Sequence, residues 1–196
     1  MRKLSARLDG DALDSAVGVW LCTRTFHTGG RRVIALDGKT VRGARDRKTD
    51  GRAPHLVAAF DHDAGVVLGQ VAVDAKSNEI PAARTLLAQF NLHGVTVTLD
   101  ALHTQTATAA QITSAGGDYV LTVKRNTPTP HRNTAALPWK HVPATRTTST
   151  GCGRRVTRTI KVADVPAWIV LAKPRRWPSC VVPSPAVARS RSRSST

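Results

Sequence analysis

A series of short apolar runs, most of them closed by an Asp- or Gly-containing turn, limits the folds open to this chain. Runs of roughly four to eight Val, Ile, Leu and Ala residues bounded by such turns are typical of β-strands. The first three runs span residues 33–36, 55–60 and 66–73. Only a short Asp- and Gly-containing turn, residues 61–65, separates the second run from the third, so the sequence predicts an antiparallel hairpin there.

Helical and strand patterns then alternate. Ser77 or Asn78 can cap a helix that has Glu79 in its first turn, where a carboxylate favours the positive end of the helix dipole. The apolar stripe of that helix is Ile80, Leu86, Leu87 and Phe90. A strand at 95–99, a helix at 104–115 and a strand at 118–123 follow. Three antiparallel strands followed by alternating helices and strands predict an α/β fold with an RNase H-like core.

The rest of the chain is predicted to add little to this core. Residues 1–28 carry apolar side chains at helical spacing and are expected to be the last helix of a preceding domain. The core domain is predicted to span 29–170, with little regular structure over 126–150 and a strand at 154–162. Residues 171–196 are rich in Pro, Arg and Ser and predict a disordered basic tail.

The charge balance points to a polyanionic partner. There are 29 Lys and Arg against 13 Asp and Glu, a formal net charge of +16, and nucleic acid is the commonest polyanion. A coding sequence rich in G and C, which raises the number of Arg codons, is an alternative explanation for part of the excess of positive charge. No basic amphipathic helix or long apolar run favours a membrane. The 3 cysteines form no CxxC pair, so neither a zinc site nor a disulfide framework is indicated, and a cytoplasmic location is expected.

Two aspartates are the candidates for catalysis. Asp37 and Asp100 each follow an apolar strand, so adjacent strands would bring both carboxylates to one rim of the sheet. Hard oxygen ligands of this kind favour Mg²⁺ or Mn²⁺, and two such ions can promote phosphodiester chemistry. The alternative is that each aspartate only starts a turn or caps a helix.

Four motifs then resemble those of one branch of insertion-sequence DDE transposases, the IS4-like, ISAs1-type branch. They fall in order over about 100 residues of the chain, with weaker similarity outside them. The motifs are Ile34–Gly43 (IALDGKTVRG), Lys76–Ile80 (KSNEI), Thr98–Ala101 with Gln105, and Gly116–Leu121 with Lys124 and Asn126.

This resemblance implies a metal-dependent enzyme that cleaves and transfers DNA strands at element ends. It assigns Asp37 and Asp100 to the metals, Mg²⁺ or Mn²⁺. It also implies DNA as partner, leaves a homodimer open and suggests a nucleoid-associated protein. Plausible phosphate contacts are Lys39, Arg42, Lys76 and Lys124, each of which could equally be a solvated surface charge. Glu79 is a candidate helper in the active site. His103 is a candidate for orienting DNA, with a polar loop histidine as the favoured alternative.

The chain departs from this family pattern in ways that put activity in doubt. Relatives have a His between two glycines and a Glu shortly after the following Arg, where this chain has Cys152 and Val156. Valine can neither bind a metal nor take a proton, so the third acid is expected to be missing. The two ends of the chain suggest that it is truncated. The tail also suggests a frameshift, because codons permitted for the residues from Ala172 onward can, in another reading frame, encode a helix followed by a strand.

Three functional interpretations follow from the sequence. The first is a truncated, inactive transposase. The second is a non-catalytic basic remnant that binds DNA. The third, an RNase H-like nuclease unrelated to mobility, is disfavoured because a generic nuclease has no reason to carry the motif series.

Overall fold

The computed structural model describes residues 7–25, 31–45, 53–74, 77–151, 154–164, 166 and 169. They fall into two compact units that divide between Pro128 and Thr129. The candidate tail at 171–196 lies outside the described residues. No helix within the described ranges is both long enough and apolar enough to cross a membrane.

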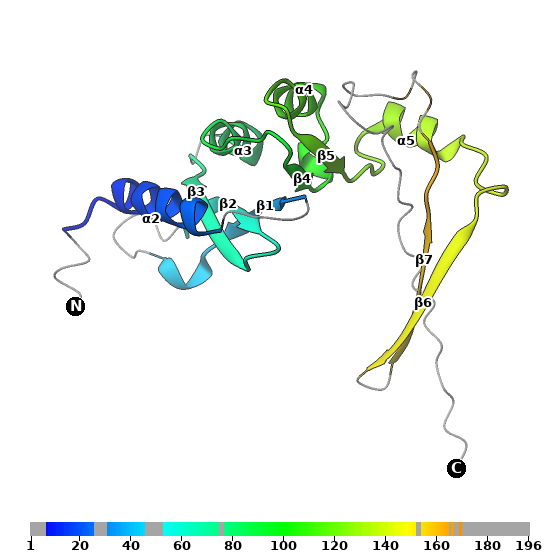
Figure 1. The fold of residues 1–196 in the computed structure, drawn as a ribbon, viewed down its shortest axis with the longest axis horizontal. Helices are drawn as coiled ribbons and strands as arrows, with labels where there is room; N and C mark the ends of the chain where they lie inside the picture. Colours follow the sequence, from blue (N-terminus) through cyan, green and yellow to red (C-terminus); the bar gives the residue numbers. More distant parts are fainter. Residues whose placement is uncertain are drawn as a thin grey trace, which may run out of the picture. The chain divides into compact units, whose positions relative to one another are not determined.

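A five-stranded mixed sheet forms the centre of the first unit (Figure 1). The strand order is β3-β2-β1-β4-β5. β1 pairs antiparallel with β2, and β2 with β3, whereas β4 runs parallel to both β1 and β5. The strands are β1 (Val33–Thr40), β2 (His55–Asp61), β3 (Val66–Ala72), β4 (Thr96–Leu99) and β5 (Asp118–Leu121).

Two helices pack on one face of this sheet and close the core. Helix α3 (Glu79–Leu87) contacts β2 and β3, and α4 (Thr106–Ser114) contacts β5, both on the same side of the sheet (Figure 1). Successive strand residues point to opposite faces. In β1, Ile34 and Leu36 are therefore buried toward the helices, while Asp37 is exposed on the other face. The core also takes in Val57, Ala59, Leu68, Ala83, Leu86, Leu87, Val97, Leu99 and Ile112.

The predicted order of strands and helices from residue 33 to residue 121 is confirmed, with one correction to the first strand. β1 does not end before Asp37 but continues to Thr40, paired with β2 from Asp37↔Ala58 to Thr40↔His55. The apolar pattern stops at Leu36 because the second half of the strand packs less deeply, although its backbone still forms the ladder. Asp37 therefore lies within a strand and not in a turn.

A third helix, α2 (Gly10–Arg24), packs against β3, but not through the predicted stripe. Leu13, Val17 and Trp20 are 49%, 45% and 56% exposed. The residue that α2 buries is Gly18, where an added Cβ would lie 2.4 Å from the carbonyl oxygen of Leu68. Of the apolar residues expected at helical spacing, Leu21 does pack against the core, but Leu13, Val17 and Trp20 do not, because a glycine, which carries no hydrophobic signal, sets the closest contact.

The second unit contains regular structure that the sequence analysis did not predict. Its elements are α5 (Pro128–Ala135), which begins at the boundary, and the antiparallel pair β6 (Ala144–Gly151) and β7 (Arg154–Lys161). The strand predicted at 154–162 is confirmed, whereas the expectation of little structure over 126–150 is wrong. β6 is exposed along its whole length, so it lacks the apolar alternation on which strand prediction depends.

Candidate functional site

The sheet register brings the two candidate aspartates together. Neighbouring β1 and β4 pair in parallel as Val33↔Thr96, Ile34↔Val97 and Ala35↔Thr98. Asp100 directly follows β4 with extended backbone angles, and continuing the register by two residues sets it level with Asp37. Both aspartates are exposed and alternate with buried neighbours, so they share the face opposite the helices. Adjacent strands lie about 4.8 Å apart, so this extended register predicts that Asp37 and Asp100 are neighbours.

Asp100 also has a local structural role. Its carboxylate accepts a hydrogen bond from the Leu102 amide at 2.9 Å and caps the 3₁₀ turn Ala101–His103. Two contacts hold this turn in place: Asn126 donates to the carbonyl of Ala101, and Thr104 donates to the carbonyl of Thr122 at 2.7 Å. The capping interpretation therefore holds for Asp100 and does not exclude a second role.

Glu79 lies at the centre of a polar cluster on the helix side of the sheet. Asn78 caps α3, which places Glu79 in the first turn above β2. The Glu79 Oε1 atom is 2.6 Å from His55 Nε2, and His55 Nδ1 is 2.8 Å from Thr40 Oγ1. If His55 Nε2–H donates to the carboxylate, neutral Nδ1 accepts from the Thr40 hydroxyl, so all three groups can be satisfied together.

The same carboxylate reaches the two segments that carry the aspartates. A Cβ added to Gly38 would come within 2.4 Å of the Glu79 carboxyl group. Glu79 Oε2 also lies 3.6 Å from Nε2 of His103, at the end of the turn that Asp100 caps. Since Gly38 and Asp37 are adjacent in a strand, Glu79 lies behind Asp37, on the opposite face of the sheet.

The other candidate residues are placed as follows. Lys39, Arg42 and Lys124 are exposed, and Lys39 shares the face of β1 that carries Asp37. Lys76 and Cys152 lie outside the described residues. His103 ends the 3₁₀ turn and is only 1% exposed, so neither alternative for it, a contact that orients DNA or an exposed polar loop histidine, fits the structure. Val156 lies in β7 opposite Ser149.

The residues fit a metal only in part. Two neighbouring carboxylates are suitable for Mg²⁺, which is commonly held by one or two carboxylates together with water and substrate phosphates. However, in the described ranges no group of three or more His, Cys, Asp or Glu side chains is arranged to hold a metal. Glu79 is directed to two histidines and does not complete the set.

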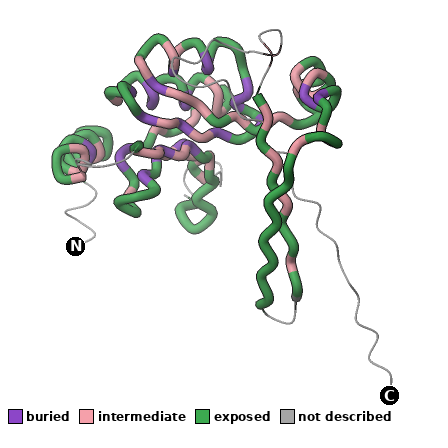
Figure 2. The backbone as a smooth tube through the Cα atoms, turned by 45° about the vertical axis from the view of Figure 1, so that its right-hand side comes forward, coloured by how far each residue is buried: buried purple, intermediate pink, exposed green. Residues whose placement is uncertain are grey.

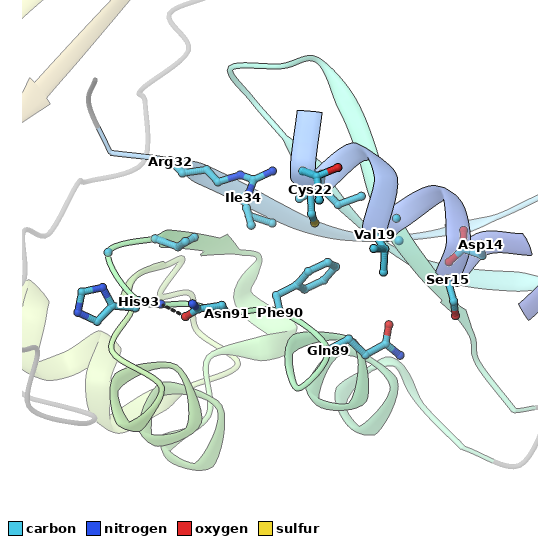
Figure 3. Close-up of a pocket in the computed structure, with 16 residues that line it drawn as sticks. Asp14, Ser15, Val19, Cys22, Arg32, Ile34, Gln89, Phe90, Asn91 and His93 are labelled. Atoms are coloured by element: carbon cyan, nitrogen blue, oxygen red, sulfur yellow. Dashed lines mark hydrogen bonds between the residues drawn. The ribbon is translucent and has the colours of Figure 1, made fainter. Parts of the chain in front are cut away.

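A cavity of about 710 Å³ lies elsewhere in the first unit (Figure 3). Residues of α2 such as Val19 and Cys22 face residues 89–93, including Phe90, across it. Neither Asp37 nor Asp100 lines it, so it is separate from the carboxylate pair.

The sequence analysis did not identify His55 or Thr40 as members of the polar cluster. A weak signal was present, because Glu79 is the only glutamate in the chain and Gly38 directly follows a candidate aspartate. Neither fact predicts which histidine meets the carboxylate, since that depends on the β1–β2 register.

Comparison with known proteins gives consistent matches. The family model described as the transposase DDE domain matches residues 28–178. A protein of Xanthobacter autotrophicus from the dhlA 3′ region, uncharacterized by name, is 44% identical over 121 residues, which are 62% of this chain and 35% of the relative. YncI of Escherichia coli O157:H7, named as a transposase, is 46% identical over 94 residues, which are 48% and 24% of the two chains.

A third relative is YhhI of Escherichia coli K12, named as an H repeat-associated transposase. It is 41% identical over 92 residues, which are 47% of this chain and 24% of the relative. The chain thus spans between 24% and 35% of the length of these three relatives. Among solved structures, the piggyBac transposase synaptic complex with hairpin DNA matches at a TM-score of 0.38 and 13% identity, over 78% of this chain and 32% of that one. That score is too low to support an argument.

Proposed function

The chain belongs to the family of transposase DDE domains, and we propose that it derives from an insertion-sequence transposase of the IS4-like, ISAs1-type branch. The proposed chemistry is DNA strand cleavage and transfer on an RNase H-like core. The observation that carries the proposal is the parallel register of β1 and β4, which ends at Ala35↔Thr98 and, if extended by two residues, sets Asp37 level with Asp100. The sheet topology supports an RNase H-like core, because strands β1 to β3 are antiparallel and are followed by the parallel strands β4 and β5.

Asp37 and Asp100 are the proposed ligands of Mg²⁺ or Mn²⁺. In this chemistry the ions activate the attacking oxygen and stabilise the leaving oxygen of a phosphodiester. The contribution proposed for the chain is to present two exposed carboxylates on the same face of neighbouring strands. Lys39, Arg42, Lys76 and Lys124 are proposed to contact phosphates without reading bases. A homodimer and a nucleoid-associated location belong to the same proposal.

Glu79 is proposed as a positioning residue and not as a metal ligand. Its carboxylate is held against Gly38 and by His55, and it approaches His103. Gly38 is next to Asp37, and His103 ends the turn capped by Asp100. One side chain therefore restrains both aspartate-bearing segments from the helix side, which would limit the spread of carboxylate positions at the metal site.

We further propose that this copy is inactive. The resemblance puts the expected third acid at Val156, and no group of three or more His, Cys, Asp or Glu side chains in the described ranges is arranged to hold a metal. The same observations, together with the net charge of +16, favour a second candidate function, a non-catalytic remnant that binds DNA.

Calorimetric titration of Mn²⁺ into the purified chain tests the proposal, with Asp37→Asn and Asp100→Asn as paired variants. Saturable binding that is lost in both variants supports a shared site. No binding by a wild-type chain that still melts cooperatively would leave only the DNA-binding candidate. Nicking of supercoiled plasmid with Mg²⁺ separates the two further: equal nicking by the wild type and Asp37→Asn would remove the enzyme interpretation.

A further inference from the structure

The hairpin formed by β6 and β7 has few features of a core element. It is a two-stranded sheet with eight paired positions from Ala144↔Lys161 to Gly151↔Arg154. β6 is exposed throughout, and Figure 2 shows both strands largely exposed. An isolated two-stranded hairpin is at best marginally stable in water. Burial therefore does not explain why this segment is a long ribbon.

The charge of the hairpin is entirely of one sign. Residues 144–161 contain five Arg or Lys and no Asp or Glu. The next acid along the chain is Asp164, beyond the end of β7. A ribbon that carries only like charges gains from a partner rich in negative charge.

The register divides the side chains into two unlike faces, because cross-strand partners share a face and successive rungs alternate. The cationic face is defined by the rungs Arg146↔Thr159, Thr148↔Thr157 and Thr150↔Arg155. The rung Ala144↔Lys161 also belongs to the cationic face, which therefore carries Arg146, Arg155 and Lys161. The opposite face has Gly151↔Arg154, Ser149↔Val156, Thr147↔Arg158 and Thr145↔Ile160, and so carries two arginines beside two apolar residues.

The arginines of the two faces also differ in their partners. On the opposite face Arg158 donates to the Ser149 hydroxyl at 3.2 Å. On the cationic face Thr148 and Thr157 bond to each other through their hydroxyls at 3.2 Å, between the rungs of Arg146 and Arg155. Arg146 and Arg155 are four rungs apart, about 14 Å along the ribbon.

We propose that the cationic face of the β6–β7 hairpin binds the phosphate backbone of duplex DNA. A separation of about 14 Å corresponds to about four base-pair steps measured along the axis of the duplex. Arg and Thr both donate hydrogen bonds to phosphate oxygens, and such contacts position a protein without reading sequence. The inference rests on the proposed function in that the partner is DNA, but it requires no metal and no catalytic activity.

Salt-dependent binding of the whole chain to a labelled 30-base-pair duplex, followed by fluorescence anisotropy, tests this face. Each phosphate contact contributes about 0.9 to the slope of log K against log salt concentration. The double variant R146Q/R155Q is expected to lower that slope by about 1.8. The matched control R158Q removes the same kind of charge from the other face and is expected to leave the slope nearly unchanged. R146K/R155K keeps the charge and should retain the wild-type slope.

Each outcome separates the two proposals. If the wild type shows no binding in 50 mM salt, the proposal that DNA is the partner fails, and the hairpin inference fails with it. If the wild type binds and R146Q/R155Q keeps its slope, only the hairpin inference is overturned. An equal loss per arginine in R158Q would also overturn it, because general charge and not one face would then set the affinity. Circular-dichroism melts of all variants verify that the fold is retained.

Discussion

The carboxylate of Glu79 lies 2.6 Å from Nε2 of His55, which ties the first turn of α3 to the first residue of β2. The same carboxylate occupies the space that a side chain at Gly38 would need. The position of Glu79 thus depends on a glycine in β1 as much as on the histidine that bonds to it.

Gly38→Ala is predicted to displace Glu79. The new methyl group would lie 2.4 Å from the carboxyl carbon, and the flexible glutamate would move and lose its bond to His55. We expect a loss of about 1–3 kcal/mol in the free energy of unfolding, since a bond to a charged group is broken and the site is overpacked. In a Glu79→Ala background the same substitution should cost much less.

Urea unfolding of the two single variants and the double variant gives the coupling energy between positions 38 and 79. Gly43→Ala is the matched control, because a Cβ at that position meets nothing within 4 Å. Additive effects at positions 38 and 79 would contradict the proposed contact.

Gly18→Ala distinguishes helix propensity from packing. Propensity alone predicts a gain of about 1 kcal/mol for alanine within a helix. However, the Cβ would lie 2.4 Å from the backbone oxygen of Leu68, which cannot move aside as a side chain can. We therefore expect a net loss of about 1–3 kcal/mol by chemical denaturation, with faster amide exchange in α2. Gly10→Ala, where a Cβ meets nothing within 4 Å, should not destabilise.

Local patterns were sufficient for the arrangement of the sheet but not for the contacts around the site. The apolar runs that became β1 to β5 carry their own periodicity, and the sequence narrowed the cap of α3 to Ser77 or Asn78, of which Asn78 is the one that caps it. The level placement of Asp37 and Asp100 does not follow from two strand ends, because Asp37 lies within β1; it is inferred by extending the β1–β4 register two residues beyond Ala35↔Thr98. In contrast, the His55–Glu79 contact and the packing of Gly18 on Leu68 depend on register and on close backbone approach, which leave no hydrophobic signature.

The hairpin illustrates a second limit. Its β6 strand is Thr-rich and exposed on both faces, so no periodic burial marks it as a strand. Only its pairing with β7 reveals which side chains share a face. The positions of the arginines were visible in the sequence, but their division between two faces was not.

Asp61 predicts an acid-sensitive part of the stability. Burial raises the pKa of its carboxyl, but hydrogen bonds from Ala64, Arg32 and Asp63 and the charge of Arg32 together hold the pKa below its ordinary value of 3.8. A carboxyl whose pKa is lower in the folded state than in the unfolded state stabilises the folded protein at pH values above the pKa that it has in the unfolded state. That contribution is lost as pH falls through the folded pKa.

Asp61→Asn is therefore expected to cost about 1.5–3 kcal/mol at pH 7, the usual range for hydrogen bonds to a charged group. The difference from wild type should shrink below about pH 4. Urea unfolding across this pH range is the measurement, with the exposed Asp164→Asn as control. A difference that stays constant with pH would show that the Arg32–Asp61 pair, at 2.7 Å, contributes through packing and not through charge.

Val156→Glu tests whether this position lacks the third acid. Val156 is partly exposed and pairs with Ser149 in a hairpin, so a glutamate can be accommodated without burying a charge. If the missing carboxylate is what prevents catalysis, Val156→Glu should raise Mg²⁺-dependent nicking of supercoiled plasmid at least tenfold, a change of about 1.4 kcal/mol in the barrier. Val156→Gln supplies the same size without the charge and should not nick, and Val156→Glu combined with Asp37→Asn should lose the gain. No nicking by a Val156→Glu variant that binds both Mn²⁺ and DNA would show that position 156 is not where the family places its third acid.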